Sequence, residues 1–264
     1  MIKLVGIDVD GTLVGSSGIV DPRVWEAAER ARQAGIRLAL CSGRPAFGVA
    51  LDYAHHLQPN GWHIFQNGAS ILHLQTGESR SAPLLPAHVQ WAIARARSTG
   101  DMLELYNDTG YAVESTSAWA REHAELLGVP FEPRAYESVA EPIVRAQWLV
   151  TVERAAQVLP EIPPGLEVGQ SGSPLMPDVR FIGMTREGVS KGSAMRAIAA
   201  AYEIALEDVM YVGDAGNDLP ALKVVGHPVA MGNADEAVRA AAAHTVADVE
   251  DAGLAQALEL ARGG

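Results

Sequence analysis

The sequence predicts an α/β protein in which an α+β domain is inserted into a parallel-sheet domain. Short apolar runs alternate with helical patterns over residues 1–82 and again over residues 186–264. This order is typical of parallel strands joined by right-handed crossovers. Residues 83–185 change to strand-like runs joined by turns, which indicates a separate unit. We therefore expect a Rossmann-like core domain in two parts, 1–82 and 186–264, with an α+β cap domain at 83–185.

The first part of the core is expected to contain three strands and two helices. Asp21 is a suitable N-cap, Pro22 fits the first helical position, and Gly35 marks the end of that helix. Pro45 is expected to begin the second helix. The predicted elements are a strand at 2–7, a helix from 22, a strand at 36–40, a helix at 45–57 and a strand at 62–65.

The inserted domain is expected to carry hairpin-connected strands with helices on one side of the sheet. Asn107-Asp108-Thr109-Gly110 separates two apolar runs and predicts a turn between two strands. The predicted elements are helices at 88–98 and 117–127, and strands at 102–106, 110–114, 145–152, 166–169 and 179–184.

The second part of the core returns to the first pattern. Ser190-Lys191-Gly192 is expected to open a helix that runs through Ala201, and the strand after it is followed at once by Gly213–Asp218. The predicted strands are 209–212, 225–231 and an edge strand at 245–246, followed by a last helix at 252–261.

Composition narrows the classes of partner. The formal net charge is −12 and no basic run occurs, which argues against nucleic acid or an anionic membrane as a partner. Cys41 is the only cysteine, so no internal disulfide and no cysteine-rich metal site can form. No apolar stretch approaches the ~20 residues that span a bilayer. We expect a soluble, cytoplasmic protein.

Two aspartates follow the first strand directly. Alternation along an extended strand would turn Asp8 and Asp10 to the same side, and Gly11 allows a sharp turn after them. The carboxyl ends of parallel strands are where open α/β sheets bind ligands, so these carboxylates could belong to a ligand site. The alternative is a strand that simply ends in an Asp-Gly turn. The other loops at that edge decide between the two interpretations.

Four loops are expected to meet at this edge: Asp8–Thr12, Cys41–Arg44, Asn67–Ala69 and Gly213–Asp218. Asp214 would then approach Asp8 and Asp10, and three carboxylates repel each other unless a divalent cation neutralises them. Oxygen ligands without histidine or cysteine favour Mg²⁺ over Zn²⁺. The sequence therefore predicts a magnesium site.

A phosphoryl group could be held against such a cation. Ser42, Arg44, Lys191 and Asn217 supply hydroxyl, cationic and amide groups, together with the loop N–H groups. Arg44 could instead pair with a carboxylate, and Lys191 alone would be a solvated residue at a helix start. A carboxylate can form an acyl phosphate, and a second one, its pKa raised by a neighbouring carboxylate, can transfer the protons.

Four ordered motifs resemble those of the haloacid dehalogenase-like superfamily. They are Asp8-Val9-Asp10-Gly11-Thr12-Leu13, Ser42-Gly43-Arg44-Pro45, Val189-Ser190-Lys191-Gly192 and Gly213-Asp214-Ala215-Gly216-Asn217-Asp218. Asn67-Gly68-Ala69 and Ala230-Met231-Gly232-Asn233-Ala234 are similar to signatures of its Cof-like, type IIB sugar-phosphatase branch. One departure is Gly183, where many relatives have an acidic residue.

The resemblance implies a role for each matching residue. Asp8 would be the nucleophile, Asp10 the general acid and base, and Lys191 would stabilise the charge on nucleophile and phosphate. Ser42 and Asn217 would lie at the phosphate, and Gly11 and Gly43 would allow close backbone approach. Mg²⁺ would be held by the Asp8 side chain, the Asp10 carbonyl and Asp214. Asp218 would support Lys191 or a metal-bound water.

The function expected from these residues is hydrolysis of a small phosphomonoester, such as a sugar phosphate, with Mg²⁺ and a phospho-aspartyl intermediate on Asp8. The insert would close over the site and contact the leaving group. A sugar phosphomutase and a non-catalytic module that binds Mg²⁺ or phosphate are the alternatives. The expected partner is a small phosphorylated metabolite, and the protein would be a monomer or a homodimer.

Overall fold

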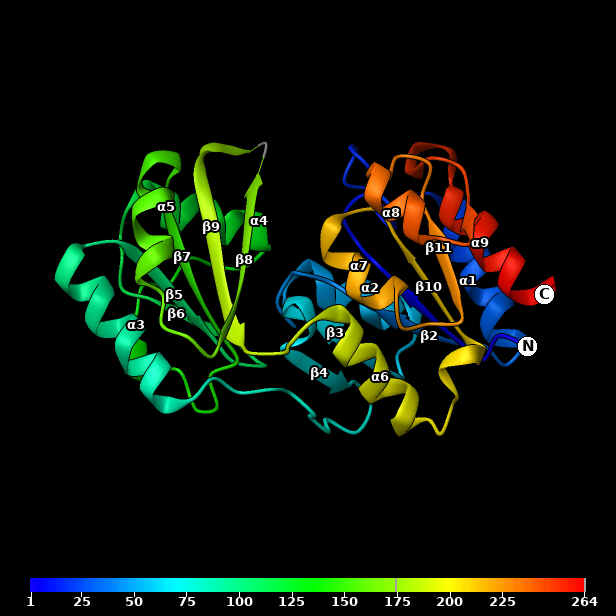
Figure 1. The fold of residues 1–264 in the computed structure, drawn as a ribbon, viewed down its shortest axis with the longest axis horizontal. Helices are drawn as coiled ribbons and strands as arrows, with labels where there is room; N and C mark the ends of the chain where they lie inside the picture. The colour runs from blue at the N-terminus through cyan, green and yellow to red at the C-terminus, as the bar shows by residue number, and fades with distance from the viewer. Residues whose placement is uncertain (174, 264) are drawn as a thin grey trace. The chain divides into compact units, whose positions relative to one another are not determined.

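The structure is a computed structural model that describes residues 1–173 and 175–263; Pro174, in the expected cap, and Gly264 lie outside them. The contacts group the chain into two compact units (Figure 1). The core unit contains Met1–Arg44, Ala50–Arg80 and the chain from Ser190, and the insert unit contains Pro45–Val49 and Ser81–Val189. None of the described helices is both long and apolar enough to cross a membrane.

The core unit is built on a parallel sheet, as the sequence predicts. Over the described residues its strand order is β12-β11-β10-β1-β2, and every neighbouring pair is parallel. β1 lies between β10 and β2 and is buried along its whole length, which explains its apolar sequence. The strands are β1 (Leu4–Ile7), β2 (Arg37–Leu40), β10 (Val209–Gly213), β11 (His227–Ala230) and β12 (His244–Thr245).

The third strand of the first part forms a hairpin beside this sheet. β3 (Trp62–Phe65) pairs antiparallel with β4 (Ser70–His73). Its link to β2 is a parallel bridge between Cys41 and Ile64, where the Ser42 N–H donates to the Ile64 carbonyl at 2.9 Å. The chain reverses after β3 because Gln66, Asn67 and Gly68 all have positive φ, which ends the strand.

Helices flank the core sheet (Figure 1). Asp21 caps α1 as expected: its carboxylate accepts the Arg23 N–H at 2.8 Å. Ser190 and Ser193 form a reciprocal capping box at the start of α6. The helices are α1 (Pro22–Gln33), α2 (Val49–Leu57), α6 (Lys191–Ala201), α7 (Leu219–Leu222), α8 (Glu236–Ala241) and α9 (Gly253–Gly263).

The predicted start of the second helix, at Pro45, is wrong. α2 begins at Val49 because Gly48 has φ +62°, a left-handed conformation that cannot continue a right-handed helix. The segment before it packs in the insert unit, where the Phe47 ring stacks on Tyr106 and Tyr111 with centroids 6.3 and 5.9 Å away.

The insert unit is built on an antiparallel sheet. Its strand order, within the described part of the chain, is β6-β5-β7-β9-β8. β8 and β9 are longer than the sequence pattern indicated. The strands are β5 (Met102–Tyr106), β6 (Tyr111–Val113), β7 (Arg145–Thr151), β8 (Leu166–Ser173) and β9 (Met176–Arg186), and the helices are α3 (Pro86–Thr99), α4 (Ala118–Leu127) and α5 (Val152–Val158).

The expectation that helices lie on one side of this sheet is wrong. β5 is buried along its whole length and alternates apolar residues between two faces. Leu103 and Leu105 join a core with α3 and α5, whereas Met102 and Tyr106 join a second core that includes Ala120 of α4. Each face of the sheet therefore needs its own apolar cover.

Gly183 of β9 leaves room for a neighbouring cation. A Cβ atom on this glycine would lie 3.1 Å from Nε of Arg145 on β7. A side chain at position 183 would therefore press on the guanidinium, which would have to shift by a few tenths of an ångström.

Gly192 sets how closely α6 approaches α7. A Cβ atom there would lie 2.3 Å from the Pro220 carbonyl oxygen, and backbone cannot yield as a flexible side chain does. We expect Gly192→Ala to lower the free energy of unfolding by about 1–3 kcal/mol, as overpacking does, although alanine favours helices. Urea unfolding measures this. Gly263→Ala is the control, since its Cβ meets no described atom within 4 Å; equal midpoints for the two variants would contradict the prediction.

Candidate active site

The two aspartates after β1 have different surroundings. Asp8 continues the ladder, its N–H donating to the Val212 carbonyl at 3.0 Å, and it is 5% exposed. The side chain of Asp10 is 61% exposed and pairs with Arg44, with Nε–Oδ2 and Nη2–Oδ1 distances of 3.0 and 2.5 Å. The expected alternation does not extend past β1, because the chain turns after Val9. Arg44 thus pairs with a carboxylate, which was one of its two expected roles, and the expected approach of Asp214 to Asp10 is not found, since the acidic cluster of the described residues omits Asp10.

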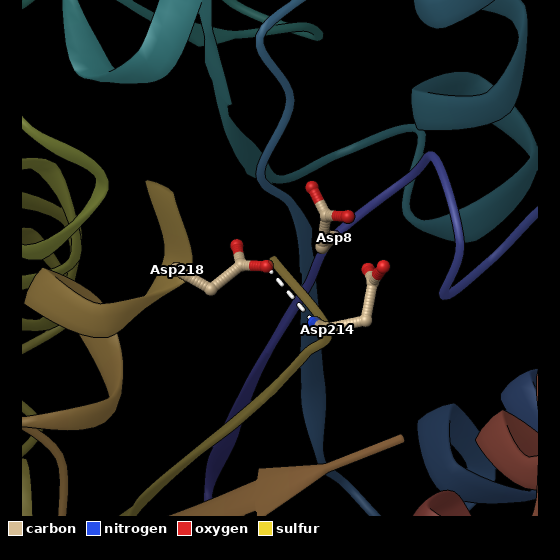
Figure 2. A group of neighbouring side chains, drawn as sticks. All are labelled: Asp8, Asp214 and Asp218. Carbon is tan, nitrogen blue, oxygen red and sulfur yellow. Dashed lines mark hydrogen bonds between the residues drawn. The ribbon is translucent and has the colours of Figure 1, made fainter. Parts of the chain in front are cut away.

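Asp8, Asp214 and Asp218 converge at the carboxyl edge of β1 and β10. One oxygen from each lies within 4.8 Å of the others (Figure 2). Lys191, at the start of α6, is completely buried; its Nζ donates to Asp8 Oδ1 and, at 2.6 Å, to Asp218 Oδ1. The ammonium thus bonds two of the three clustered carboxylates, and Asp10 is not part of the cluster.

Burial dominates the electrostatics of this cluster. It raises the pKa of Asp8 well above its usual value; the Asp218 charge adds to this, and Lys191 opposes it. Burial also raises the pKa of Asp214 to about 6, although the Thr12 hydroxyl, which donates to its Oδ1 at 2.9 Å, acts against the shift. Burial lowers the pKa of Lys191, but the carboxylates of Asp8 and Asp218 outweigh it, so that pKa lies above its ordinary value and the amine is charged.

Both oxygens of Asp218 are occupied by donors. Oδ1 accepts Lys191 Nζ and, at 2.7 Å, the Tyr211 hydroxyl, and Oδ2 accepts the N–H groups of Asp214 and Ala215, each at 3.0 Å. Figure 2 shows the bond from the Asp214 N–H. A carboxylate has about four lone-pair positions. This arrangement fits the expected support of Lys191 and leaves Asp218 poorly suited to bind a metal directly.

The carboxylates of Asp8 and Asp214 fit a hard divalent cation. Both are oxygen donors, and the metal-compatible cluster found among the described residues contains carboxylates alone. Gly11 allows Asp214 to come this close: its φ is +87°, and a Cβ atom there would lie 2.2 Å from Asp214 Oδ2. The side chains therefore supply two anionic ligands beside a backbone turn.

Asn67 connects the Ser42 loop with Asn217. Its Oδ1 accepts Nδ2 of Asn217 at 3.0 Å, and its N–H donates to the Ser42 carbonyl at 2.9 Å. Ser42 is completely buried, and its Oγ accepts the Arg44 N–H at 3.0 Å. Gly43 lies against the same amide, since its Cβ would be 3.2 Å from Asn67 Oδ1. The polar residues expected at the phosphate thus lie together.

Four contributors to this geometry were not among the expected site residues. Thr12 bonds Asp214, Tyr211 bonds Asp218, and Asn67 bonds Asn217. Asn233 donates to the Gly11 carbonyl at 2.8 Å and thereby supports the turn after Asp10. Thr12, Asn67 and Asn233 lie within the motifs described above, so their positions in the sequence could have indicated a role at the site. Tyr211 cannot be distinguished in the sequence from an ordinary buried strand residue.

A family model for haloacid dehalogenase-like hydrolases matches residues 5–258. The chain belongs to the haloacid dehalogenase-like hydrolase family. Pyridoxal phosphate phosphatase YbhA of Escherichia coli K12 is 27% identical to it over 274 residues, and the match covers 96% of each chain. The expected family and α/β fold class are therefore confirmed.

Solved structures extend the similarity. A haloacid dehalogenase-like hydrolase from Bacteroides thetaiotaomicron has a TM-score of 0.87 and 26% identity, and the match covers 98% of this chain and 99% of that one. The subclass IIB sugar phosphatase BT4131 has a TM-score of 0.80 and 26% identity, with 98% of both chains covered. This haloacid dehalogenase-like hydrolase is a phosphoric monoester hydrolase of the type IIB branch.

We expect divalent cations to stabilise this hydrolase through its acidic cluster. A ligand that binds only the folded state adds about 2.7 kcal/mol at 100 times its Kd. We expect Mg²⁺, compared with EDTA, to raise the midpoint of thermal unfolding of the wild type, and Asp214→Asn to lose most of this increase. Asp52→Asn, which changes an exposed carboxylate on α2, should respond like the wild type. An undiminished response of Asp214→Asn in calorimetry would contradict the assignment.

Proposed function

We propose that this hydrolase removes the phosphate from a small phosphomonoester, such as a sugar phosphate, with Mg²⁺ and a phospho-aspartyl intermediate on Asp8. The observation that carries the proposal is the buried Asp8 carboxylate, held by the buried ammonium of Lys191 at the ligand-binding edge of the sheet. The names of two similar proteins, a pyridoxal phosphate phosphatase and a sugar phosphatase, support a small phosphorylated metabolite as substrate.

In the first step an Asp8 oxygen attacks phosphorus. The new bond joins that oxygen to phosphorus, the ester P–O bond breaks, and the leaving alkoxide takes a proton from Asp10. Lys191 stabilises the negative charge shared by Asp8 and the phosphoryl oxygens. Ser42, Asn217 and loop N–H groups hold the other phosphoryl oxygens.

In the second step Asp10 accepts a proton from water as the water attacks phosphorus. The bond between phosphorus and Asp8 breaks, and inorganic phosphate leaves. The carboxylates of Asp8 and Asp214, with the backbone carbonyl of Asp10, would hold Mg²⁺. When bound, the cation supplies charge neutralisation to the carboxylates and the phosphoryl group.

Arg44 has two possible anionic partners, the Asp10 carboxylate and a bound phosphate ester. In the structure it pairs with Asp10, and both carboxylate oxygens accept hydrogen bonds from the guanidinium. Asp10 can therefore exchange a proton with a leaving group only when Arg44 releases one of these oxygens. A bound phosphate ester offers Arg44 a bidentate anionic partner of its own, so substrate binding would prepare Asp10 for its first role.

The nucleophile is tested by Asp8→Asn, which keeps the size of the side chain. We expect phosphate release from an aryl phosphate with Mg²⁺ to fall on the order of a thousand-fold or more, since an amide cannot form the acyl phosphate. Asp52→Asn should keep wild-type turnover. In acid-quenched turnover, mass spectrometry should find one phosphoryl group on the wild-type peptide that contains Asp8.

Three outcomes would contradict the proposal. Wild-type turnover by Asp8→Asn would remove Asp8 as nucleophile. Isomerisation of a hexose phosphate without net phosphate release would indicate the mutase. Inactivity of the wild type with Mg²⁺ across a panel of phosphorylated metabolites would favour a non-catalytic binding module.

A further inference from the structure

Tyr211 is a buried tyrosine whose hydroxyl ends at the acidic cluster. It lies in β10, is 0% exposed, and its hydroxyl donates to Asp218 Oδ1 at 2.7 Å. Lys191 donates to the same oxygen at 2.6 Å. The phenol and the ammonium therefore share one acceptor, Oδ1 of Asp218.

The ring of Tyr211 is seated by a neighbouring glycine. Gly6 of β1 is its partner in the parallel ladder, and a Cβ atom on Gly6 would lie 2.7 Å from Cδ2 of the ring. Met195 of α6 closes the same space, with Sδ 2.7 Å from that Cβ position. The ring thus has little freedom, and its hydroxyl is aimed at Asp218 by the packing between β1, β10 and α6.

We propose that Tyr211 is a positioning residue for Lys191, which it controls through their shared acceptor on Asp218. The inference rests on the proposed function, in which the charge of Lys191 acts on Asp8 and the phosphoryl group. With the phenol in place, Asp218 takes part of its stabilisation from Tyr211 and from two backbone N–H groups. Lys191 therefore does not have to neutralise Asp218 alone.

Removing the hydroxyl changes the position of the ammonium. Oδ1 of Asp218 would keep Lys191 as its donor and lose Tyr211, so the lysine would be drawn toward Asp218 and away from Asp8. Charge that develops on the phosphoryl group in the transition state would then be stabilised less. The effect belongs to the transition state, so kcat should fall while KM changes little.

Tyr211→Phe tests this because it removes one hydroxyl and keeps the seated ring. We expect kcat to fall about tenfold or more, as loss of a hydrogen bond to a buried charged group does, with KM within about twofold. Tyr202→Phe is the matched control: the Tyr202 hydroxyl accepts the Trp62 N–H at 2.8 Å, away from the cluster. It should keep the wild-type kcat. A Tyr211→Phe enzyme that is less stable but turns over as the wild type does would overturn the inference.

A double variant separates action through Asp218 from a general loss of packing. If Tyr211 works through this carboxylate, Tyr211→Phe should cause little further loss of kcat in an Asp218→Asn background. A loss as large as in the wild-type background would contradict the route through Asp218.

A measurement that needs no turnover distinguishes this inference from the proposed function. The chain has three lysines, Lys3, Lys191 and Lys223, so acetylation of each can be followed by mass spectrometry. Relative to the other two, Lys191 should react faster in Tyr211→Phe than in Tyr202→Phe, because its ammonium would be held by Asp218 alone instead of by both Asp8 and Asp218. Equal relative rates would refute the role of Tyr211. A wild type without phosphatase activity would refute the proposed function instead, and the labelling would still decide on Tyr211.

Discussion

The buried ion cluster around Lys191 is the constraint on which the site depends. Two buried carboxylates and a buried ammonium are costly unless their charges and hydrogen bonds are matched. Lys191 meets Asp8 from β1 and Asp218 from the loop after β10, and is itself the first residue of α6. Removing the lysine alone would leave two buried anions facing each other. Three elements that are distant in the sequence are thereby held in one arrangement.

Charge, capping and close packing together determine where α6 begins. A cation in the first turn of a helix opposes the helix dipole, so Lys191 needs the anions that it meets. Ser190 and Ser193 satisfy N–H groups of this first turn, and Gly192 lets the helix approach Pro220 closely. The same few residues therefore determine both the helix start and the position of its buried ammonium.

Features that depend on local patterns could be predicted from the sequence. The apolar run before Asp8, the Asp21-Pro22 cap and the start of α6 at Lys191 are of this kind. The start of α2 could not be predicted, because it depends on the left-handed conformation of Gly48. The position of α4 also escaped prediction, since an apolar strand such as β5 does not reveal which cover each of its faces receives.

The candidate site also contains features that could be predicted from the sequence and features that could not. The approach of Asp214 to Asp8 follows from the parallel arrangement of β1 and β10, whose carboxyl ends lie at one edge of the sheet, and the sequence pattern predicts that arrangement. The separation of Asp10 from the cluster does not, because alternation ends with β1 and Arg44 becomes its partner. The filling of the hydrogen-bond acceptor positions of Asp218 depends on Tyr211, which the strand pattern cannot distinguish from any other core residue.

Two aspartates only two positions apart are thus in opposite environments. Asp8 is buried, and its hydrogen bond to Lys191 holds its carboxylate in place. Asp10 is largely exposed beside a guanidinium that an anionic substrate could attract away. A fixed carboxylate suits a nucleophile, which must keep its geometry through bond formation. A carboxylate with an exchangeable partner suits proton transfer, which requires it to be ionised at one stage and protonated at another. The division of labour that we propose follows from these surroundings, since the two side chains are chemically identical.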